Sequence, residues 1–230
     1  MKTIMNELET ITRQGYDFVR VFEDWLILMT SALCQDEEEY MKIMGRYRNE
    51  GERGSRPADY FANAFGALML AYQEKPHDYL GDIFTYHVTR GENGQFFTPD
   101  SVCELMVRMT IPEIQDGQSV CDPACGSGRM LIKATEKNRY GQFYGVDVDR
   151  RCAMMTALNL CFRNVAGAVI WGNTLSLECW GGYGLGRSTI GGAMRKITAE
   201  ESKALLVTRL PNLDTKSELD ENTGDQLVLF

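Results

Sequence analysis

The sequence predicts an α/β protein in which a helical N-terminal region precedes a doubly wound parallel sheet. Near the N-terminus apolar side chains recur at intervals of three and four, as at Phe18, Phe22 and Trp25, which is typical of a buried helix face. After Gly94 short apolar segments alternate with amphipathic ones, a pattern typical of parallel strands joined by helices. We therefore expect a helical region over 1–90, an α/β domain over 91–177, and a Gly-rich loop, short helix and flexible acidic tail over 178–230.

The helical region is expected to break at the Gly-, Ser- and Pro-containing loop Gly51–Pro57 and to resume over Asp59–Tyr72 and Tyr79–His87. Its large aromatic and methionine side chains are expected in a core. Five basic residues gather around the loop: Lys42, Arg46, Arg48, Arg53 and Arg56. Two interpretations stay open for them, a solvated helix end or a contact with DNA. The net charge of −8 argues against a broad phosphate-binding face.

In the α/β domain Thr98 is expected to cap a helix with Pro99 at its first position. The expected strands are Ser119–Asp122, Gln142–Val148 and Ala168–Trp171, and the expected helices are Met130–Asn138, Arg150–Arg163 and Thr198–Leu206. Beyond Leu177 glycines dominate, so we expect the sheet to be cut short after its third strand.

Composition excludes several classes of protein. No apolar segment approaches the roughly 20 residues that cross a bilayer, and residues 1–10 lack the pattern of a secretory signal. Seven cysteines, none in a Cys-x-x-Cys pair, argue against a disulfide framework and a zinc ribbon. We expect a cytoplasmic protein without a membrane partner and without a metal site.

The strongest motif is Asp-Pro-Ala-Cys-Gly-Ser-Gly at Asp122–Gly128, between an expected strand and helix. Gly126 and Gly128 allow a tight turn that a ligand can approach closely, and amides at the helix start can hold a carboxylate or phosphate. Such a glycine pair also suits a dinucleotide. The acid Asp122 favours S-adenosylmethionine, whose ammonium group a dinucleotide lacks.

Two further motifs follow the next strands. Asp147 closes the second strand, where an acid binds ribose hydroxyls in nucleotide folds, and Asp149 is expected either to act similarly or to cap the following helix. Asn173 follows the third strand, where its amide faces an adenine ring; a simple Asn-containing turn is the equally supported alternative.

The order Gly-Gln-Phe-Phe-Thr-Pro (Gly94–Pro99) and then Asp122–Gly128 resembles the modification subunits of type I restriction systems and related adenine-specific DNA methyltransferases, over roughly Tyr79–Leu177. The resemblance implies a partial class I (Rossmann-like) methyltransferase domain that uses S-adenosyl-L-methionine. It implies that residues 95–99 fold over the methionine end, that the Gly turn cradles the amino acid part and that Asp147 holds the ribose. That family usually has Asp where this chain has Asn173. The candidate cofactor-binding residues are Gln95, Phe96, Phe97, Thr98, Pro99, Asp122, Pro123, Ala124, Gly126, Gly128, Asp147, Val148 and Asn173.

The chain departs from the family at its catalytic loop. The family carries Asn-Pro-Pro-Tyr or Asn-Pro-Pro-Phe. Its Asn and the adjacent proline carbonyl accept hydrogen bonds from the target adenine's amine, and its aromatic ring stacks on the flipped base. In this chain no two prolines are adjacent. We assign no catalytic residue, and consider Trp180 or Tyr183 as a substitute for the stacking aromatic. Two functions remain: a DNA adenine-N6 methyltransferase completed by other residues or a partner chain, or a catalytically silent module that binds cofactor and DNA.

Partners are expected to be DNA and a specificity or restriction subunit. The segment Gln226–Phe230, with Gln226, Leu227, Leu229 and Phe230, resembles the peptide with which bacterial replication and repair enzymes dock on the sliding clamp. The alternative is a terminal strand that packs on the domain.

Overall fold

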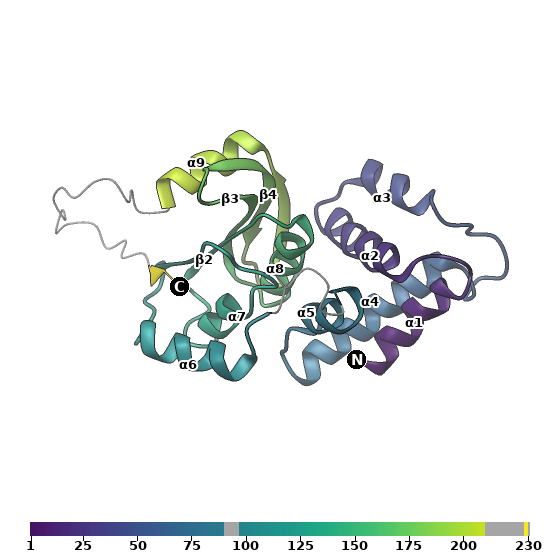
Figure 1. The fold of residues 1–230 in the computed structure, drawn as a ribbon, viewed down its shortest axis with the longest axis horizontal. Coiled ribbons are helices and arrows are strands. Elements are labelled where there is room, and N and C mark those ends of the chain that lie inside the picture. Colours follow the sequence, from purple (N-terminus) through teal and green to yellow (C-terminus); the bar gives the residue numbers. More distant parts are fainter. Residues whose placement is uncertain (90–96, 210–227, 230) are drawn as a thin grey trace. The chain divides into compact units, whose positions relative to one another are not determined.

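The computed structural model describes residues 1–89, 97–209 and 228–229. The chain divides into two compact units, Met1–Phe97 and Thr98–Phe230 (Figure 1). The first unit is helical and the second contains the sheet, as the sequence predicts.

The helical unit begins several of its helices at aspartate side chains. Asp17, Asp36 and Asp78 each accept a hydrogen bond from a backbone N–H in the first turn that follows, at 2.9–3.0 Å, which satisfies an amide that has no partner within the helix. The elements are α1 (Lys2–Thr12), α2 (Phe18–Leu33), α3 (Glu37–Met44), α4 (Pro57–Glu74), α5 (Tyr79–Ile83) and a π-helical turn η1 (Phe84–Thr89).

The core of this unit contains the expected aromatic side chains. Phe22 and Trp25 of α2 are buried, and the indole N–H of Trp25 donates a hydrogen bond to the carbonyl of Phe61 at 3.3 Å. The buried Asp24 accepts hydrogen bonds from Arg46 and from the hydroxyl of Tyr47. Burial and this carboxylate raise the pKa of Tyr47 well above its usual range.

Two members of the basic cluster are therefore tied to carboxylates within the unit. Arg46 pairs with Asp24, and Arg56 forms a two-pronged ion pair with Asp59 at 2.8 and 2.9 Å. These pairs favour a structural interpretation of Arg46 and Arg56 over a role in phosphate binding.

The second unit has strands β1 (Ser119–Asp122), β2 (Gln142–Asp147), β3 (Ala166–Asn173), β4 (Glu178–Gly186), β5 (Ala193–Ile197) and β6 (Val228–Leu229), and helices α6 (Asp100–Thr110), α7 (Arg129–Thr135), α8 (Arg150–Phe162) and α9 (Ala199–Arg209). The strand order is β5-β4-β3-β2-β1-β6. β1, β2, β3 and β6 pair in parallel, whereas β4 and β5 are antiparallel to their neighbours. The sheet is therefore mixed, with the predicted parallel strands at its centre.

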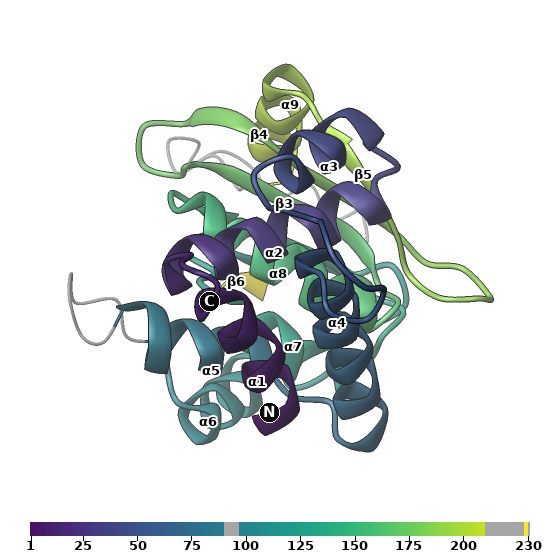
Figure 2. The ribbon, with the colours of Figure 1, turned by 90° about the vertical axis from the view of Figure 1, so that its right-hand side faces the viewer.

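Helices cover both faces of this sheet, as alternation of side chains along a strand requires. On β2, Gly145 faces Leu131 of α7, while the adjacent Val146 packs with Ile170 and Leu206 of α9 on the other face. Figure 2 shows α9 lying along β4. The carboxyl ends of β1, β2 and β3 thus meet at one edge, where their following loops gather.

Three expectations about this unit are wrong. The sheet is not cut short after the third strand, because β4 and β5 extend it beyond β3, and the glycines from Gly181 to Gly186 lie in β4 rather than in a loop, while Gly191 and Gly192 lie between β4 and β5. Helix α6 begins at Asp100 with Pro99 as its capping residue, so Thr98 is not the cap. Pro99 has φ −59° and ψ 146°, and its carbonyl accepts the first helical hydrogen bonds.

The C-terminal peptide is described only in part. Val228 and Leu229 pair in parallel with Val120 and Cys121 of β1, which agrees with the terminal-strand alternative. Gln226, Leu227 and Phe230 lie outside the described residues, as does most of the acidic tail. Within the described ranges, no helix is long and apolar enough to cross a membrane.

Candidate functional site

The loop between β1 and α7 is the tight turn that its glycines predict. Gly126 has φ +55° and Gly128 has φ +87°, conformations that residues with a Cβ rarely adopt. The amide of Gly128 donates to the carbonyl of Cys125 at 2.7 Å, and α7 starts directly after it. The chain thus reverses at the end of β1 within a few residues, leaving Ala124 exposed at the turn.

Helix α8 holds this turn in place through two buried polar side chains that the sequence did not reveal as site residues. Thr156 donates a hydrogen bond to the carbonyl of Gly126, and Asn159 donates one to the carbonyl of Ser127, each at 2.8 Å. A Cβ on Gly128 would come within 3.0 Å of the Thr156 side chain. The only signal in the sequence is that both residues are polar within the otherwise apolar part of the helix, residues 152–162.

Two carboxyl groups approach the turn from the ends of neighbouring strands. Asp122 at the end of β1 is buried, and its Oδ1 accepts a hydrogen bond from the amide of Ala124 at 3.1 Å. Asp147 at the end of β2 accepts from the amides of Gly126 and Asp149, both at 2.8 Å. The site therefore brings together the predicted acid pair, and Asp147 also fastens the turn.

Burial dominates the electrostatics of both acids. Loss of solvent raises the pKa of Asp122 to about 6, and the nearby Asp147 carboxylate adds to the shift. Burial also raises the pKa of Asp147, although the hydrogen bonds that its carboxylate accepts from backbone amides oppose this shift. Within residues 97–209, no Lys or Arg forms an ion pair with either carboxylate. The site thus has buried negative charge that a cationic ligand would compensate.

The expected capping role of Asp149 is confirmed. Its carboxylate accepts a hydrogen bond from the amide of Arg151 at 2.8 Å and forms an ion pair with the same residue at 2.6 Å. Its side chain is therefore committed to the start of α8, and Asp147 is the acid of this strand end that faces the Gly turn.

The end of β3 contributes Asn173 and Thr174. The side-chain oxygen of Asn173 accepts from the amides of Leu175 and Ser176 at 2.9 and 3.3 Å, which is the Asn-containing turn foreseen as an alternative. Thr174 donates to the carbonyl of Pro123 at 2.8 Å, so this loop is linked to the Gly turn. An adenine contact by Asn173 would have to come from its NH₂ group.

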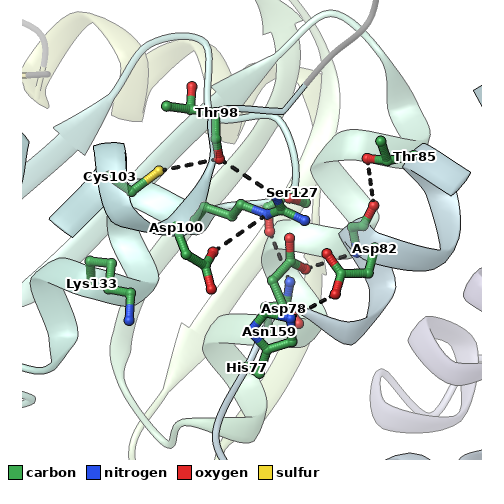
Figure 3. Close-up of polar contacts among 12 residues, drawn as sticks. His77, Asp78, Asp82, Thr85, Thr98, Asp100, Cys103, Ser127, Lys133 and Asn159 are labelled. Carbon is green, nitrogen blue, oxygen red and sulfur yellow. Dashed lines mark hydrogen bonds and ion pairs between the residues drawn. The ribbon is translucent and has the colours of Figure 1, made fainter. Parts of the chain in front are cut away.

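The segment before α6 lies beside the start of α7. Arg129, the residue after the Gly turn, donates to the carbonyl of Thr98 at 3.4 Å and lies 3.9 Å from the carboxylate of Asp100. Figure 3 shows Cys103 pointing its sulfur at the same Thr98 carbonyl, 3.6 Å away. Thr98 and Pro99 are thus held next to the turn, and their covering role stays a prediction.

The other residues of the expected covering segment, 95–97, are not among the described residues of the second unit. Gln95 and Phe96 lie outside the described residues. Phe97 belongs to the helical unit, where its ring stacks on Phe84 at 5.5 Å between centroids. Their expected contacts with a cofactor stay predictions.

Val148, the residue directly after Asp147, is 57% exposed and borders Trp171 and Trp180. Its carbonyl accepts a hydrogen bond from the indole N–H of Trp171 at 3.1 Å. Trp180 is 45% exposed, whereas Tyr183 is only 5% exposed. Of the two residues considered as substitute stacking aromatics, only Trp180 presents its ring to solvent. In the described part of the chain, no three His, Cys, Asp or Glu side chains cluster as metal ligands.

Comparison with known proteins agrees with these motifs. The N-6 DNA Methylase family matches residues 75–184. A type I restriction enzyme MjaIX methylase subunit from Methanocaldococcus jannaschii is 32% identical over 123 residues, covering 48% of this chain and 22% of the relative. The MpnII methylase subunit from Mycoplasma pneumoniae is 25% identical over 123 residues, covering 47% and 23%. The chain therefore spans about a fifth of the length of these relatives.

Solved structures align more loosely. A modification subunit of a putative type I restriction enzyme from Vibrio vulnificus YJ016 is 21% identical, with a TM-score of 0.40, covering 61% of this chain and 31% of that one. A putative class I S-adenosylmethionine-dependent methyltransferase from Listeria monocytogenes is 14% identical, with a TM-score of 0.40, covering 73% and 52%. The sequence similarity and the matched motif region together show that, over about half of its length, this chain belongs to the N-6 DNA methylase family and is homologous to type I restriction enzyme methylase subunits.

Proposed function

We propose that the carboxyl ends of β1, β2 and β3 bind S-adenosyl-L-methionine. The observation that carries this proposal is a pair of acids, the buried Asp122 and the partly buried Asp147, next to a glycine turn that leaves its backbone open. The cofactor's ammonium would pair with Asp122, and its ribose hydroxyls would donate to Asp147. Each oxygen of Asp147 accepts one amide in the structure, which leaves acceptor capacity for hydroxyl donors.

The charge of the site favours this ligand over a dinucleotide. A pyrophosphate is an anion, and the buried carboxylate of Asp122 and the partly buried one of Asp147 would repel it. S-adenosylmethionine instead brings an ammonium and a sulfonium group, which favour the ionised form of both acids. Pro123, Ala124 and Val148 would line the ligand, Thr98 and Pro99 would cover it together with residues 95–97, and the NH₂ group of Asn173 would face the adenine.

The wider activity is proposed from the relatives. Methylase subunits of type I restriction enzymes suggest adenine-N6 methylation of DNA, with a specificity or restriction subunit as partner. This chain contains no adjacent prolines and hence no Asn-Pro-Pro motif. We therefore propose that these 230 residues bind the cofactor and DNA without transferring methyl groups, and that transfer requires a catalytic site completed by other residues or by a partner chain.

Sliding-clamp binding through Gln226, Leu227, Leu229 and Phe230 remains a separate proposal. The backbone pairing of Val228 and Leu229 with β1 would have to be released before those side chains could dock in a clamp pocket. A clamp pull-down with the full chain and with Leu229→Ala tests it, and equal retention of both proteins would contradict it.

Calorimetry with S-adenosylmethionine, followed by a labelled-methyl assay on unmethylated DNA, tests the main proposal. We expect saturable binding and no transfer. Gly126→Val should abolish binding because a β-branched residue strains a backbone at φ +55°. A matched control is Gly117→Val, which also has positive φ (+80°) but lies before β1 and away from the acids. Retained binding in Gly126→Val would reject the site, and methyl transfer by the isolated chain would reject the silent module.

A further inference from the structure

Trp171 and Trp180 form an aromatic pair on the surface of the sheet, beyond the proposed cofactor site. Their ring centroids are 5.4 Å apart and their planes are inclined by 54°. Trp180 is 45% exposed although it is among the largest apolar side chains. A tryptophan whose role is to fill the core would be buried, so the exposure of this pair requires an explanation.

An irregularity in the sheet places Trp180 next to Trp171. Trp171 of β3 pairs with Gly181, but the next residue, Gly172, pairs with Cys179. Trp180 is therefore the extra residue of a β-bulge. Bulges redirect side chains and are common beside active sites. Here the bulge adds a second indole to the face that already presents Trp171.

The residues around the pair leave the rings open and add positive charge. The hollow of about 170 Å³ beside the rings is lined by Gly181 and Gly182, which have no side chains to cover it. Its only charged lining residues are Arg150 and Lys196. Arg150 also lies over the Trp171 ring, 5.7 Å from its centroid. Beyond Trp180, an adjoining hollow is lined by Glu178, Glu200 and Lys203, where acids outnumber the one cation, so the excess of positive charge lies on the Arg150 side.

Exposed aromatic rings next to cationic side chains are the features with which proteins hold unpaired nucleobases. Bases stack on the rings with little regard to sequence, while Lys and Arg contact the backbone phosphates. We propose that Trp171, Trp180, Arg150 and Lys196, here called the tryptophan platform, bind single-stranded nucleic acid, with an unpaired base stacked on Trp180. This inference takes from the proposed function only that nucleic acid is a partner of the chain; it does not require that the cofactor site be occupied.

The chain's tryptophan content gives a direct readout. It has three tryptophans, of which Trp25 is 1% exposed in the helical unit. Quenching of the exposed indole emission by unlabelled dodecathymidylate therefore reports the platform. We expect saturable quenching, and stronger binding of this probe than of a duplex of the same length, because duplex bases are already stacked on one another.

Substitutions separate stacking from charge. Trp180→Ala should weaken binding of fluorescein-labelled dodecathymidylate about 5- to 150-fold, the range for loss of one stacked base, whereas Trp180→Phe should retain most of the affinity. Two cations predict a slope of roughly −1.4 for log affinity against log salt. Lys196→Gln should reduce the magnitude of this slope by about half, and it should weaken binding equally for oligonucleotides of different base sequence.

Tyr140→Ala is the matched control. Tyr140 is also an exposed aromatic, 51% exposed, with the guanidinium of Arg187 4.5 Å from its ring, but it lies near the opposite end of β2. Its loss should leave binding unchanged. Equal weakening by Tyr140→Ala and Trp180→Ala would show a general surface effect and overturn the proposal, as would an unaltered affinity in Trp180→Ala.

S-adenosylhomocysteine distinguishes failure of the platform from failure of the cofactor site. We expect Trp180→Ala to bind this ligand as the unaltered chain does, and Gly126→Val to lose it while keeping the oligonucleotide. Displacement of dodecathymidylate by S-adenosylhomocysteine would show that the tryptophans line the cofactor's adenine pocket, which overturns the platform and leaves the proposed function standing.

Discussion

Asp122→Asn should make the unliganded protein more stable while it removes the proposed ligand's main ion pair. Asp122 is buried at the end of β1, where loss of solvent raises its pKa from 3.8 to about 6. In neutral solution the folded protein must therefore hold a charge that burial disfavours. Asn keeps the shape, and its oxygen can still accept the hydrogen bond of Ala124.

The magnitude follows from this shift. A carboxyl group whose pKa is higher in the folded state favours folding only while it is protonated, so its contribution is present below about pH 4 and is lost as the pH rises through about 6. A shift of about 2 units corresponds to roughly 3 kcal/mol above pH 7. At about pH 5 the folded-state carboxyl is mostly protonated, and the cost falls to about half. Asp122→Asn should thus stabilise the second unit more at pH 8 than at pH 5.

Hydrogen–deuterium exchange of the peptide that covers β1 measures this locally, at each pH, against the unaltered chain. In parallel, calorimetry with S-adenosylhomocysteine should show at least tenfold weaker binding, because a charge-assisted pair is lost. An exchange rate in β1 that is unaltered at both pH values would contradict the assigned burial cost. Unaltered ligand affinity would contradict the assigned ion pair.

Asp147→Asn is the matched control, with the opposite expected sign. Both oxygens of Asp147 accept backbone amides, from Gly126 and Asp149. Asn would place its NH₂ group against one of these N–H donors and lose a hydrogen bond worth about 1 kcal/mol or more. Faster exchange in β1 is therefore expected for Asp147→Asn, and slower exchange for Asp122→Asn.

Three further perturbations test separate parts of the structure. Gly128→Ala should destabilise the second unit by about 1–3 kcal/mol in urea titrations, because its φ is +87° and the new Cβ would lie 3.0 Å from Thr156; stability equal to the unaltered chain would contradict the assigned strain. Affinity for S-adenosylhomocysteine should rise between pH 5 and pH 7.5, as the carboxyl group of Asp122 with its pKa of about 6 ionises and pairs with the ligand ammonium; a flat calorimetric profile would exclude that pairing. Asp24→Ala should destabilise the helical unit by about 1–3 kcal/mol, because it leaves the buried hydroxyl of Tyr47 without its acceptor and Arg46 without its ion pair, and thermal unfolding that is unaltered would show that these contacts are not structural.

The parts of the second unit that the sequence predicted well depend on local signals. β1, β2 and β3 are short apolar runs that end at polar residues, and the turn at Gly126 and Gly128 has a backbone that only glycine adopts readily. The acids at the ends of β1 and β2 then meet because parallel strands end at the same edge of a sheet. No long-range information was needed for these features.

The Gly-rich strand β4 and the turn that follows it could not be predicted in this way, because their glycines are required by contacts with residues distant in sequence. A Cβ on Gly182 of β4 would lie 2.3 Å from the carbonyl oxygen of Val169 on β3, and one on Gly192, directly before β5, would lie 2.0 Å from that of Cys161 on α8. Glycine marks such close backbone approach, but Val169 is 13 positions from Gly182 in sequence and Cys161 is 31 positions from Gly192. Local sequence patterns alone predict a flexible loop for the same residues. The buried Thr156 and Asn159 were missed for a similar reason, since their partners lie on the Gly turn.

The bulge at Trp180 also bears on how a chain of net charge −8 would contact nucleic acid. Binding that depends on counterion release needs many cations, and this surface offers two at the rings. Stacking makes no such demand, because it acts through the faces of the bases. Val148 directly follows Asp147 of the proposed cofactor site and lies two residues before Arg150 of the platform, and its carbonyl accepts a hydrogen bond from Trp171. A strand held mainly by its bases could therefore lie beside a negatively charged site, and its binding should remain in salt concentrations that release a protein held by phosphate contacts alone.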